Sequence, residues 1–231
     1  MADKTQSMLV PVDDNLWVVA APLRFLGVHV GTRMTVVRLS CGRLWLHSPV
    51  PLARETRNEL AELGEIGHIV APNLFHHLYV GDIADSFPGA TVHAAAGLRR
   101  KRKDLRIDET LGEAPPAAWR DDLDQLHIEG TLLGETVFFH RETRTLISSD
   151  LAENFASSDH WLTRLYLKSQ RLEHRFGVAW LLRVCYRDKH KARRCIDRLL
   201  EWDIERVILA HGEIVESGGR AALREAFAWL K

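Results

Sequence analysis

The chain has 231 residues, and its 31 Lys plus Arg balance its 31 Asp plus Glu, so the formal net charge is zero. This balance gives no electrostatic basis for binding nucleic acid or an anionic membrane. No apolar stretch approaches the roughly 20 residues that span a bilayer, the first ten residues lack a secretory signal, and the three cysteines form no metal or redox pair. We therefore expect one cytoplasmic domain over residues 1–231, with buried free thiols and neither a nucleic-acid nor a membrane partner.

The first hundred residues predict strands with a few helices between them. Short runs rich in β-branched and aromatic residues indicate the strands, and Gly64 is a typical stop for the first helix. The expected strands are 16–20, 34–39, 44–47, 67–71 and 91–93, and the expected helices are 53–63 and 80–86.

The second half repeats this order after a polar surface excursion over 99–122. Strands 136–140 and 145–148 are expected to form a hairpin with a four-residue connection. Apolar residues at helical spacing follow over about 158–202, and a strand at 206–209 and a helix at 219–230 complete the chain. This order predicts an α+β fold, a four-layer αββα sandwich of two packed sheets, with a helical cap inserted at about 155–202.

Three polar segments follow predicted strands: residues 73–77, with Asn73, His76 and His77; residues 148–150, which end in Asp150; and residues 210–212, which contain His211. Imidazoles and a carboxylate at strand ends, far apart in sequence, are typical of a metal site on one rim of an α/β fold.

The order of these segments over residues 16–211 resembles the metallo-β-lactamase superfamily, as a degenerate branch of it. In an ungapped alignment, Asn73 and Phe75 fall where the family has the first two histidines of its metal loop. His77 takes the position of the loop aspartate, Asp150 matches the bridging aspartate and His211 matches the last histidine.

The resemblance implies a reduced metal site. The middle histidine of the family has no counterpart, and Glu135 lies near its position. His77, Asp150 and His211 would hold one zinc or iron ion with an open fourth position, which suits a metal-dependent hydrolase. His76 would line the site, because successive residues usually point apart.

Other interpretations of these residues remain open. The same side chains could form a metal-free polar cluster in a ligand-binding or scaffold protein that kept the fold and lost the chemistry. Glu135 is either a substitute ligand or a solvated carboxylate, and His47 is either site-lining or structural. Arginines of the cap could favour an anionic small-molecule ligand; they are Arg164, Arg171, Arg175 and Arg183.

Overall fold

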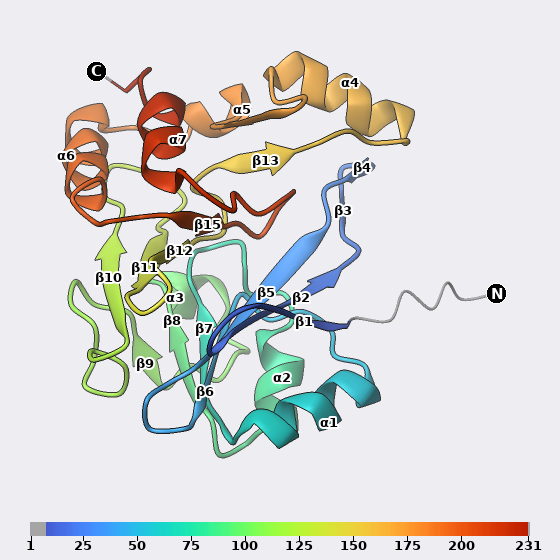
Figure 1. The fold of residues 1–231 in the computed structure, drawn as a ribbon, viewed down its shortest axis with the longest axis vertical. Coiled ribbons are helices and arrows are strands. Elements are labelled where there is room, and N and C mark those ends of the chain that lie inside the picture. Colours follow the sequence, from blue (N-terminus) through green and yellow to red (C-terminus); the bar gives the residue numbers. More distant parts are fainter. Residues whose placement is uncertain (1–7, 231) are drawn as a thin grey trace.

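The computed structural model describes residues 8–230, whose larger sheet has seven strands in the order β1-β2-β5-β6-β7-β8-β9 (Figure 1). The first four strands of this order are antiparallel to one another, and β6 to β9 are parallel. The strands are β1 (Leu9–Asp13), β2 (Leu16–Ala21), β5 (Thr32–Arg38), β6 (Leu44–His47), β7 (Ile66–Ala71), β8 (Thr91–Ala94) and β9 (Glu109–Thr110).

The second sheet has four strands in the order β10-β11-β12-β15. The expected hairpin is present, since β11 and β12 pair antiparallel across residues 141–144. β12 and β15 pair parallel, with Ile147 opposite Ile208. The strands are β10 (Leu123–His127), β11 (Thr136–His140), β12 (Thr145–Ile147) and β15 (Arg206–Ile208).

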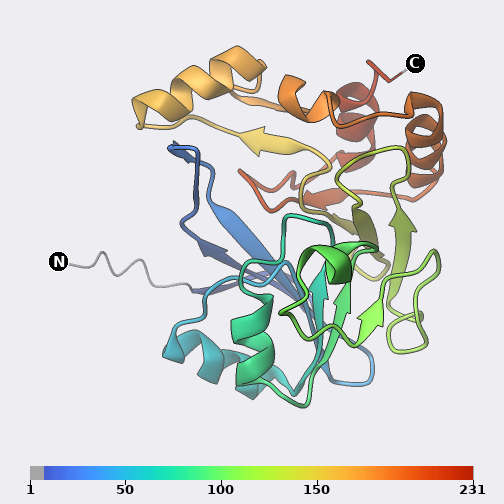
Figure 2. The same ribbon diagram turned by 180° about the vertical axis from the view of Figure 1, so that it is seen from behind.

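An apolar core lies between the two sheets, and helices cover their outer faces (Figures 1 and 2). Trp45 and Val70 of the first sheet meet Phe138 and Ile147 of the second in this inner core. α1 (Arg54–Leu63) and α2 (Val80–Ser86) pack on the first sheet, while α6 (Lys189–Leu199) and α7 (Gly219–Ala226) pack on the second. The predicted four-layer αββα sandwich is therefore confirmed.

The segment after Asp150 is less helical than its apolar spacing predicted. α4 (Trp161–Gln170) ends at Arg171, and β14 (Arg175–Gly177) then pairs antiparallel with β13 (Glu153–Phe155) before the short α5 (Trp180–Arg183). The segment expected to form the helical cap thus contains α4, α5 and α6 and also the strand β14, because pairing with β13 overrides the local helical pattern there.

Two smaller segments complete the fold. The strands β3 (Arg24–Phe25) and β4 (Val28–His29) form a hairpin that contacts α4. The polar excursion contains the short helix α3 (Leu98–Lys101) as well as β9. Of the cysteines, Cys195 is buried as expected, Cys185 is only half-buried, and Cys41 is exposed in a turn after β5. Within residues 8–230, no helix is long and apolar enough to cross a membrane.

The sheet topology brings several chain segments to one edge of the sandwich. The carboxyl ends of parallel strands lie at the same edge of a sheet, so Ser48 after β6 lies near Asn73 after β7. Asp150 after β12 lies near His211 after β15 for the same reason. β5 runs antiparallel to β6, so its start, next to Gly31, lies at this edge too.

Candidate metal centre

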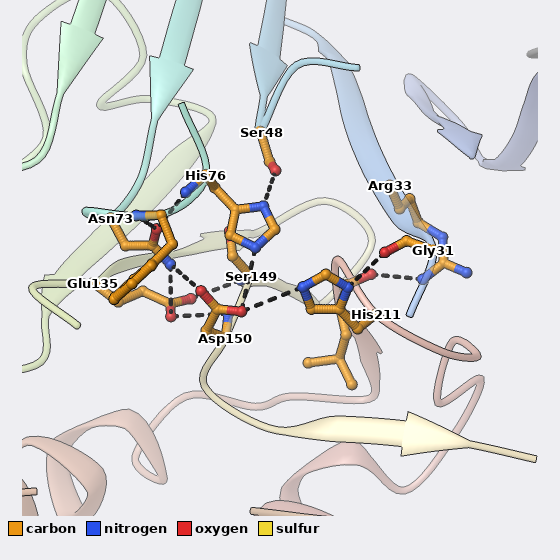
Figure 3. Close-up of polar contacts among 11 residues, drawn as sticks. Gly31, Arg33, Ser48, Asn73, His76, Glu135, Ser149, Asp150 and His211 are labelled. Carbon is orange, nitrogen blue, oxygen red and sulfur yellow. Dashed lines mark hydrogen bonds and ion pairs between the residues drawn. The ribbon is translucent and has the colours of Figure 1, made fainter. Parts of the chain in front are cut away.

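Two imidazoles and one carboxylate meet at this edge (Figure 3). Nε2 of His76 lies 3.2 Å from Oδ1 of Asp150, and Nε2 of His211 lies 3.4 Å from the same oxygen. Ligand atoms of the three residues all lie within 4.8 Å of one another. The exposed fraction of the side chain is 8% for His76, 13% for Asp150 and 10% for His211, so the cluster is mostly buried but keeps some contact with solvent.

Asn73 shapes the loop that presents His76. Its side-chain Oδ1 accepts hydrogen bonds from the backbone N–H groups of Phe75 and His76, each at 2.8 Å. This is the local turn that a short amide side chain stabilises. The Asn73 amide Nδ2 donates to Oδ2 of Asp150 at 2.8 Å, so one buried side chain ties the loop to the carboxylate.

Ser48 sets the orientation of the His76 ring. Its hydroxyl lies 2.6 Å from Nδ1 of His76, which directs Nε2 towards Asp150. Ser48 has a left-handed backbone (φ 55°) and is 1% exposed. Serine, histidine and aspartate thus stand in line as in a serine hydrolase, but a hydroxyl this deeply buried cannot reach a substrate. Ser48 is a positioning residue.

The His211 ring is held from the opposite side. Its Nδ1 lies 2.7 Å from the carbonyl oxygen of Gly31, which only accepts, so Nδ1 carries the proton and Nε2 faces Asp150. The Arg33 guanidinium donates to the carbonyls of Leu209 and Gly212, both at 2.6 Å, and so holds the backbone on either side of His211.

Glu135 supports the turn that carries Asp150. Its carboxylate accepts from the backbone N–H of Ser149 at 2.6 Å and from that of Asp150 at 2.9 Å. Glu135 is 1% exposed, so it is a buried support and not the solvated carboxylate of one interpretation. Burial, together with the nearby Asp150, raises the pKa of Glu135 to about 8.

The charges of the cluster are strongly linked. Burial opposes ionisation of Asp150, but His76 and His211 outweigh it and hold the pKa of that carboxyl well below its usual range. Burial likewise opposes protonation of His211, yet the hydrogen bond and charge of Asp150 raise the pKa of this imidazole. A positive charge beside Asp150 is therefore strongly favoured, whether a proton or a metal ion supplies it.

His77 lies outside the cluster of candidate ligands. Its Nδ1 accepts a hydrogen bond from the Arg102 guanidinium at 2.9 Å. Burial, Lys101 and Arg102 lower the pKa of His77. His76 takes the place that the ungapped alignment predicted for His77, because the Asn73 turn changes which of the two successive side chains faces the rim.

His47 is buried in the inner core, stacked on Trp45 and edge-on to Phe138. Burial lowers its pKa to about 3, with a smaller contribution from His76. Its Nε2 has no hydrogen-bond partner among residues 8–230. His47 therefore packs behind the centre as a neutral ring and does not join the cluster.

The sequence reasoning missed Ser48, Arg33 and Glu153 as parts of the centre. Glu153 on β13 is 6% exposed, and its Oε2 has no partner within the described chain. Burial raises its pKa to about 7, although the charge of His211 acts in the opposite direction. Glu153 lies three residues after Asp150, which was the available signal; Ser48 and Arg33 carry no motif of their own.

Comparisons with known proteins agree on the fold and leave the activity open. Residues 13–159 match the sequence model of a family described as a domain of unknown function, DUF4336. No curated protein matches the chain. The family match includes Asp150 but ends before α4, so it does not include His211.

Similar solved structures include several metallo-β-lactamases. DIM-1 exposed to ceftazidime is 15% identical, with a TM-score of 0.68 over 98% of each chain. FIM-1 from Pseudomonas aeruginosa in its mono-zinc form is 14% identical, with a TM-score of 0.67 over 98% of this chain and 95% of that one. A flavoprotein from Thermotoga maritima is 11% identical, with a TM-score of 0.69 over 97% of this chain and 61% of that one. The chain has the metallo-β-lactamase fold, and identities this low establish nothing further.

Proposed function

We propose that this member of the DUF4336 family is a metal-dependent hydrolase-like protein. The chain belongs to that family because the family match spans well over half of its length. One zinc or iron ion would be held by Nε2 of His76, Nε2 of His211 and a carboxylate oxygen of Asp150. This ligand set keeps the expected Asp150 and His211 and uses His76 in place of His77.

The hydrogen bond between Nδ1 of His211 and the Gly31 carbonyl carries the proposal. In a neutral His211 ring, this bond leaves a lone pair on Nε2, 3.4 Å from a carboxylate oxygen. Two electron-rich atoms at that distance favour a positive charge between them, which either a proton on Nε2 or a metal ion supplies. Histidines that bind metals commonly donate their second N–H to a backbone carbonyl in this way.

The donor chemistry fits a single borderline metal ion. Two imidazole nitrogens and one carboxylate form a set of three protein ligands that zinc or iron accepts with an open position. Ser48 and the Gly31 carbonyl would keep both rings turned inward. FIM-1 has been obtained in a mono-zinc form, so one zinc ion is compatible with this fold.

A bound ion would supply Lewis acidity and lower the pKa of a water molecule to about 7. Asp150, His76 and His211 would hold this ion at the rim of the sandwich. Glu153, buried nearby with a pKa of about 7, could accept and return a proton near neutral pH. Asn73 and Glu135 would keep the Asp150 carboxylate in place.

A metal-free ligand-binding protein is the second candidate, and a specific observation favours it. The Asp150 carboxylate can already accept hydrogen bonds from Asn73, His76 and His211. With His211 protonated, the cluster is electrically satisfied without an ion. The fold would then serve only to bind a ligand.

Elemental analysis of protein purified without a metal-affinity tag tests the proposal. We expect about one equivalent of zinc or iron in the wild type and its loss in both His76→Ala and His211→Ala. The matched control is His77→Ala, an adjacent imidazole that contacts Arg102 and not the cluster, and it should keep the ion.

Loaded and metal-stripped protein should then be compared on ester, thioester, phosphodiester and lactam substrates. Turnover that appears with the ion and disappears in His211→Ala would support the hydrolase. If the wild type takes up no metal after incubation with zinc, iron or manganese, the metal-free candidate replaces it. If His77→Ala loses the ion and His76→Ala keeps it, the ligand set is wrong.

A further inference from the structure

A second concave site lies in the part of the chain that follows the family match. A cavity of about 580 Å³ is bounded by the end of α4, β14, α5 and α7, which lie together along one end of the molecule (Figure 1). This volume is within the range of sites for small molecules. None of its lining residues belongs to the His76–Asp150–His211 cluster.

The cavity carries an excess of positive charge. Arg171, Arg175 and Arg183 line it, and Glu225 is the one carboxylate in its lining. Arg175 pairs with Glu225 at 2.9 Å, but both side chains are mostly exposed, and such pairs contribute little. Two guanidinium groups are therefore left without a counter-charge in the lining.

Arg183 and Arg171 have donors to spare. Nε of Arg183 donates to the Val178 carbonyl at 3.1 Å, and its guanidinium lies over the Trp229 ring, 5.0 Å from the centroid. Its terminal nitrogens make no hydrogen bond within residues 8–230, and neither does the side chain of Arg171 there. Burial and the charges of Arg175 and Arg171 lower the pKa of Arg183.

Part of the remaining lining is apolar, and a hydrogen bond holds its helices together. Leu172, Phe176 and Val178 contribute to it, and Trp180, with 66% of its surface exposed, offers an aromatic face. The Gln170 side-chain oxygen accepts the backbone N–H of Leu181 at 2.9 Å, which joins the end of α4 to α5. The walls are thus formed before any ligand arrives.

We propose that this cavity binds a small organic anion, separately from the metal centre. Arg171 and Arg183 would hold a carboxylate or phosphate group, since the planar guanidinium fork matches both. An apolar or aromatic part of the same molecule would lie against Phe176 and Trp180. A neutral ligand of the same shape should bind more weakly, because it offers no counter-charge to the two arginines.

Isothermal titration of metal-stripped protein with phenyl phosphate, benzoate, inorganic phosphate and benzyl alcohol tests the proposal. Removing the metal, and repeating the titration in His211→Ala, prevents binding of phosphate at the metal centre from being mistaken for this site. We expect the aromatic anions to bind, benzyl alcohol not to bind, and inorganic phosphate to bind more weakly than phenyl phosphate. A stronger response to phenyl phosphate than to benzoate would identify a phosphate ligand, and the reverse a carboxylate.

Arg171→Gln and Arg183→Gln should each weaken binding of the aromatic anions at least 10-fold. Arg164→Gln, which removes an exposed arginine of α4 outside the cavity, should leave it unchanged. Thermal unfolding of each variant checks that it is folded, and Arg183→Lys supplies a milder change that keeps the charge. The proposal is overturned if neither anion binds at concentrations up to about 10 mM, or if Arg164→Gln weakens binding as much as the cavity variants do.

Discussion

The hydroxyl of Ser48 orients a proposed ligand, His76, without being a candidate ligand itself. It contacts Nδ1 of His76 at 2.6 Å, and the backbone N–H of Ser48 donates to the Val70 carbonyl at 3.0 Å. The residue is thus fixed by the sheet and in turn fixes the ring. In other metalloproteins, loss of such a partner of a ligand histidine lowers metal affinity about 10- to 100-fold.

Ser48→Ala should therefore lower zinc affinity roughly 10- to 100-fold while the fold is kept. Competition with a chromophoric chelator measures this change. Ser149→Ala is the matched control, because its buried hydroxyl has no hydrogen-bond partner among residues 8–230 and it adjoins Asp150. Equal losses in the two variants would mean that Ser48 does not orient His76.

Gly212, directly after His211, occupies a position where a residue with a Cβ atom would be strained. Its φ is +80°, and a Cβ there would lie 2.1 Å from the backbone oxygen of Asn154. Gly42 has a similar φ of +82° but no atom within 4 Å of such a Cβ. An alanine at Gly42 would therefore meet backbone strain alone, whereas an alanine at Gly212 would meet the same strain and a steric clash.

Gly212→Ala should lower the free energy of unfolding by about 2 to 4 kcal/mol, from strain and clash together. Gly42→Ala should cost about 1 kcal/mol, from strain alone. Urea unfolding measures both values. Similar losses in the two variants would contradict the close approach of Gly212 to Asn154.

At the scale of elements, the neighbouring strands β7 and β8 carry a buried pair of histidines. Nδ1 of His68 lies 3.1 Å from Nε2 of His93, and the edges of both rings pack with Trp119. Burial lowers the pKa of each to about 4, with Arg43 adding to the effect at His68 and His68 adding to it at His93. Both rings are neutral in the folded protein at pH 6, where the unfolded chain already takes up protons.

This pair should make the fold sensitive to acid. The pKa values of about 4 in the folded protein lie below the ordinary 6.5. The contribution of the neutral pair to the free energy of unfolding is therefore fully present above pH 6.5 and is lost as the pH falls towards 4. Each proton contributes a slope of up to about 1.4 kcal/mol per pH unit. His68→Gln should reduce the slope of unfolding free energy against pH, whereas His190→Gln, at an exposed position, should not.

Urea unfolding of the three proteins between pH 4 and pH 7 checks this expectation. His47, Glu135 and Glu153 also have shifted pKa values, but they are common to the wild type and both variants, so the difference in slope reports on the His68–His93 pair. An unchanged slope in His68→Gln would show that the pair does not stay neutral in the folded state.

At the scale of the whole molecule, the proposed ligands come from both sheets. His76 follows β7 of the larger sheet, whereas Asp150 and His211 follow β12 and β15 of the smaller one. A bound ion would therefore join the two sheets directly, and it would stabilise only the folded state, in which the three ligands meet.

Zinc should accordingly raise the free energy of unfolding of the metal-stripped protein. Free zinc at 100 times its dissociation constant would add about 2.7 kcal/mol. Differential scanning calorimetry with and without zinc measures the shift, and His77→Ala should respond like the wild type. Equal stabilisation of His211→Ala would place the ion elsewhere.

The fold could be predicted largely from the order of apolar runs, while the centre could be predicted only in part. Asp150 and His211 follow strands whose parallel pairing brings them together, and this is visible as strand ends in the sequence. The choice between His76 and His77 depends on two hydrogen bonds of Asn73, which no periodicity encodes. β14 was missed because its partner β13 lies about 20 residues away, beyond the reach of local pattern.

The contacts of His211 with Gly31 and of Arg33 with Leu209 and Gly212 join residues that are 176 to 180 positions apart in the chain. During synthesis, the larger sheet can fold while residues 209–212 are still inside the ribosome, because domains begin to fold from the N-terminal side. Until those residues emerge, Gly31 and Arg33 have no partner at the edge of the sheet. The proposed centre therefore cannot assemble until residues 209–212 have emerged, which is after the strands of both sheets have been synthesised.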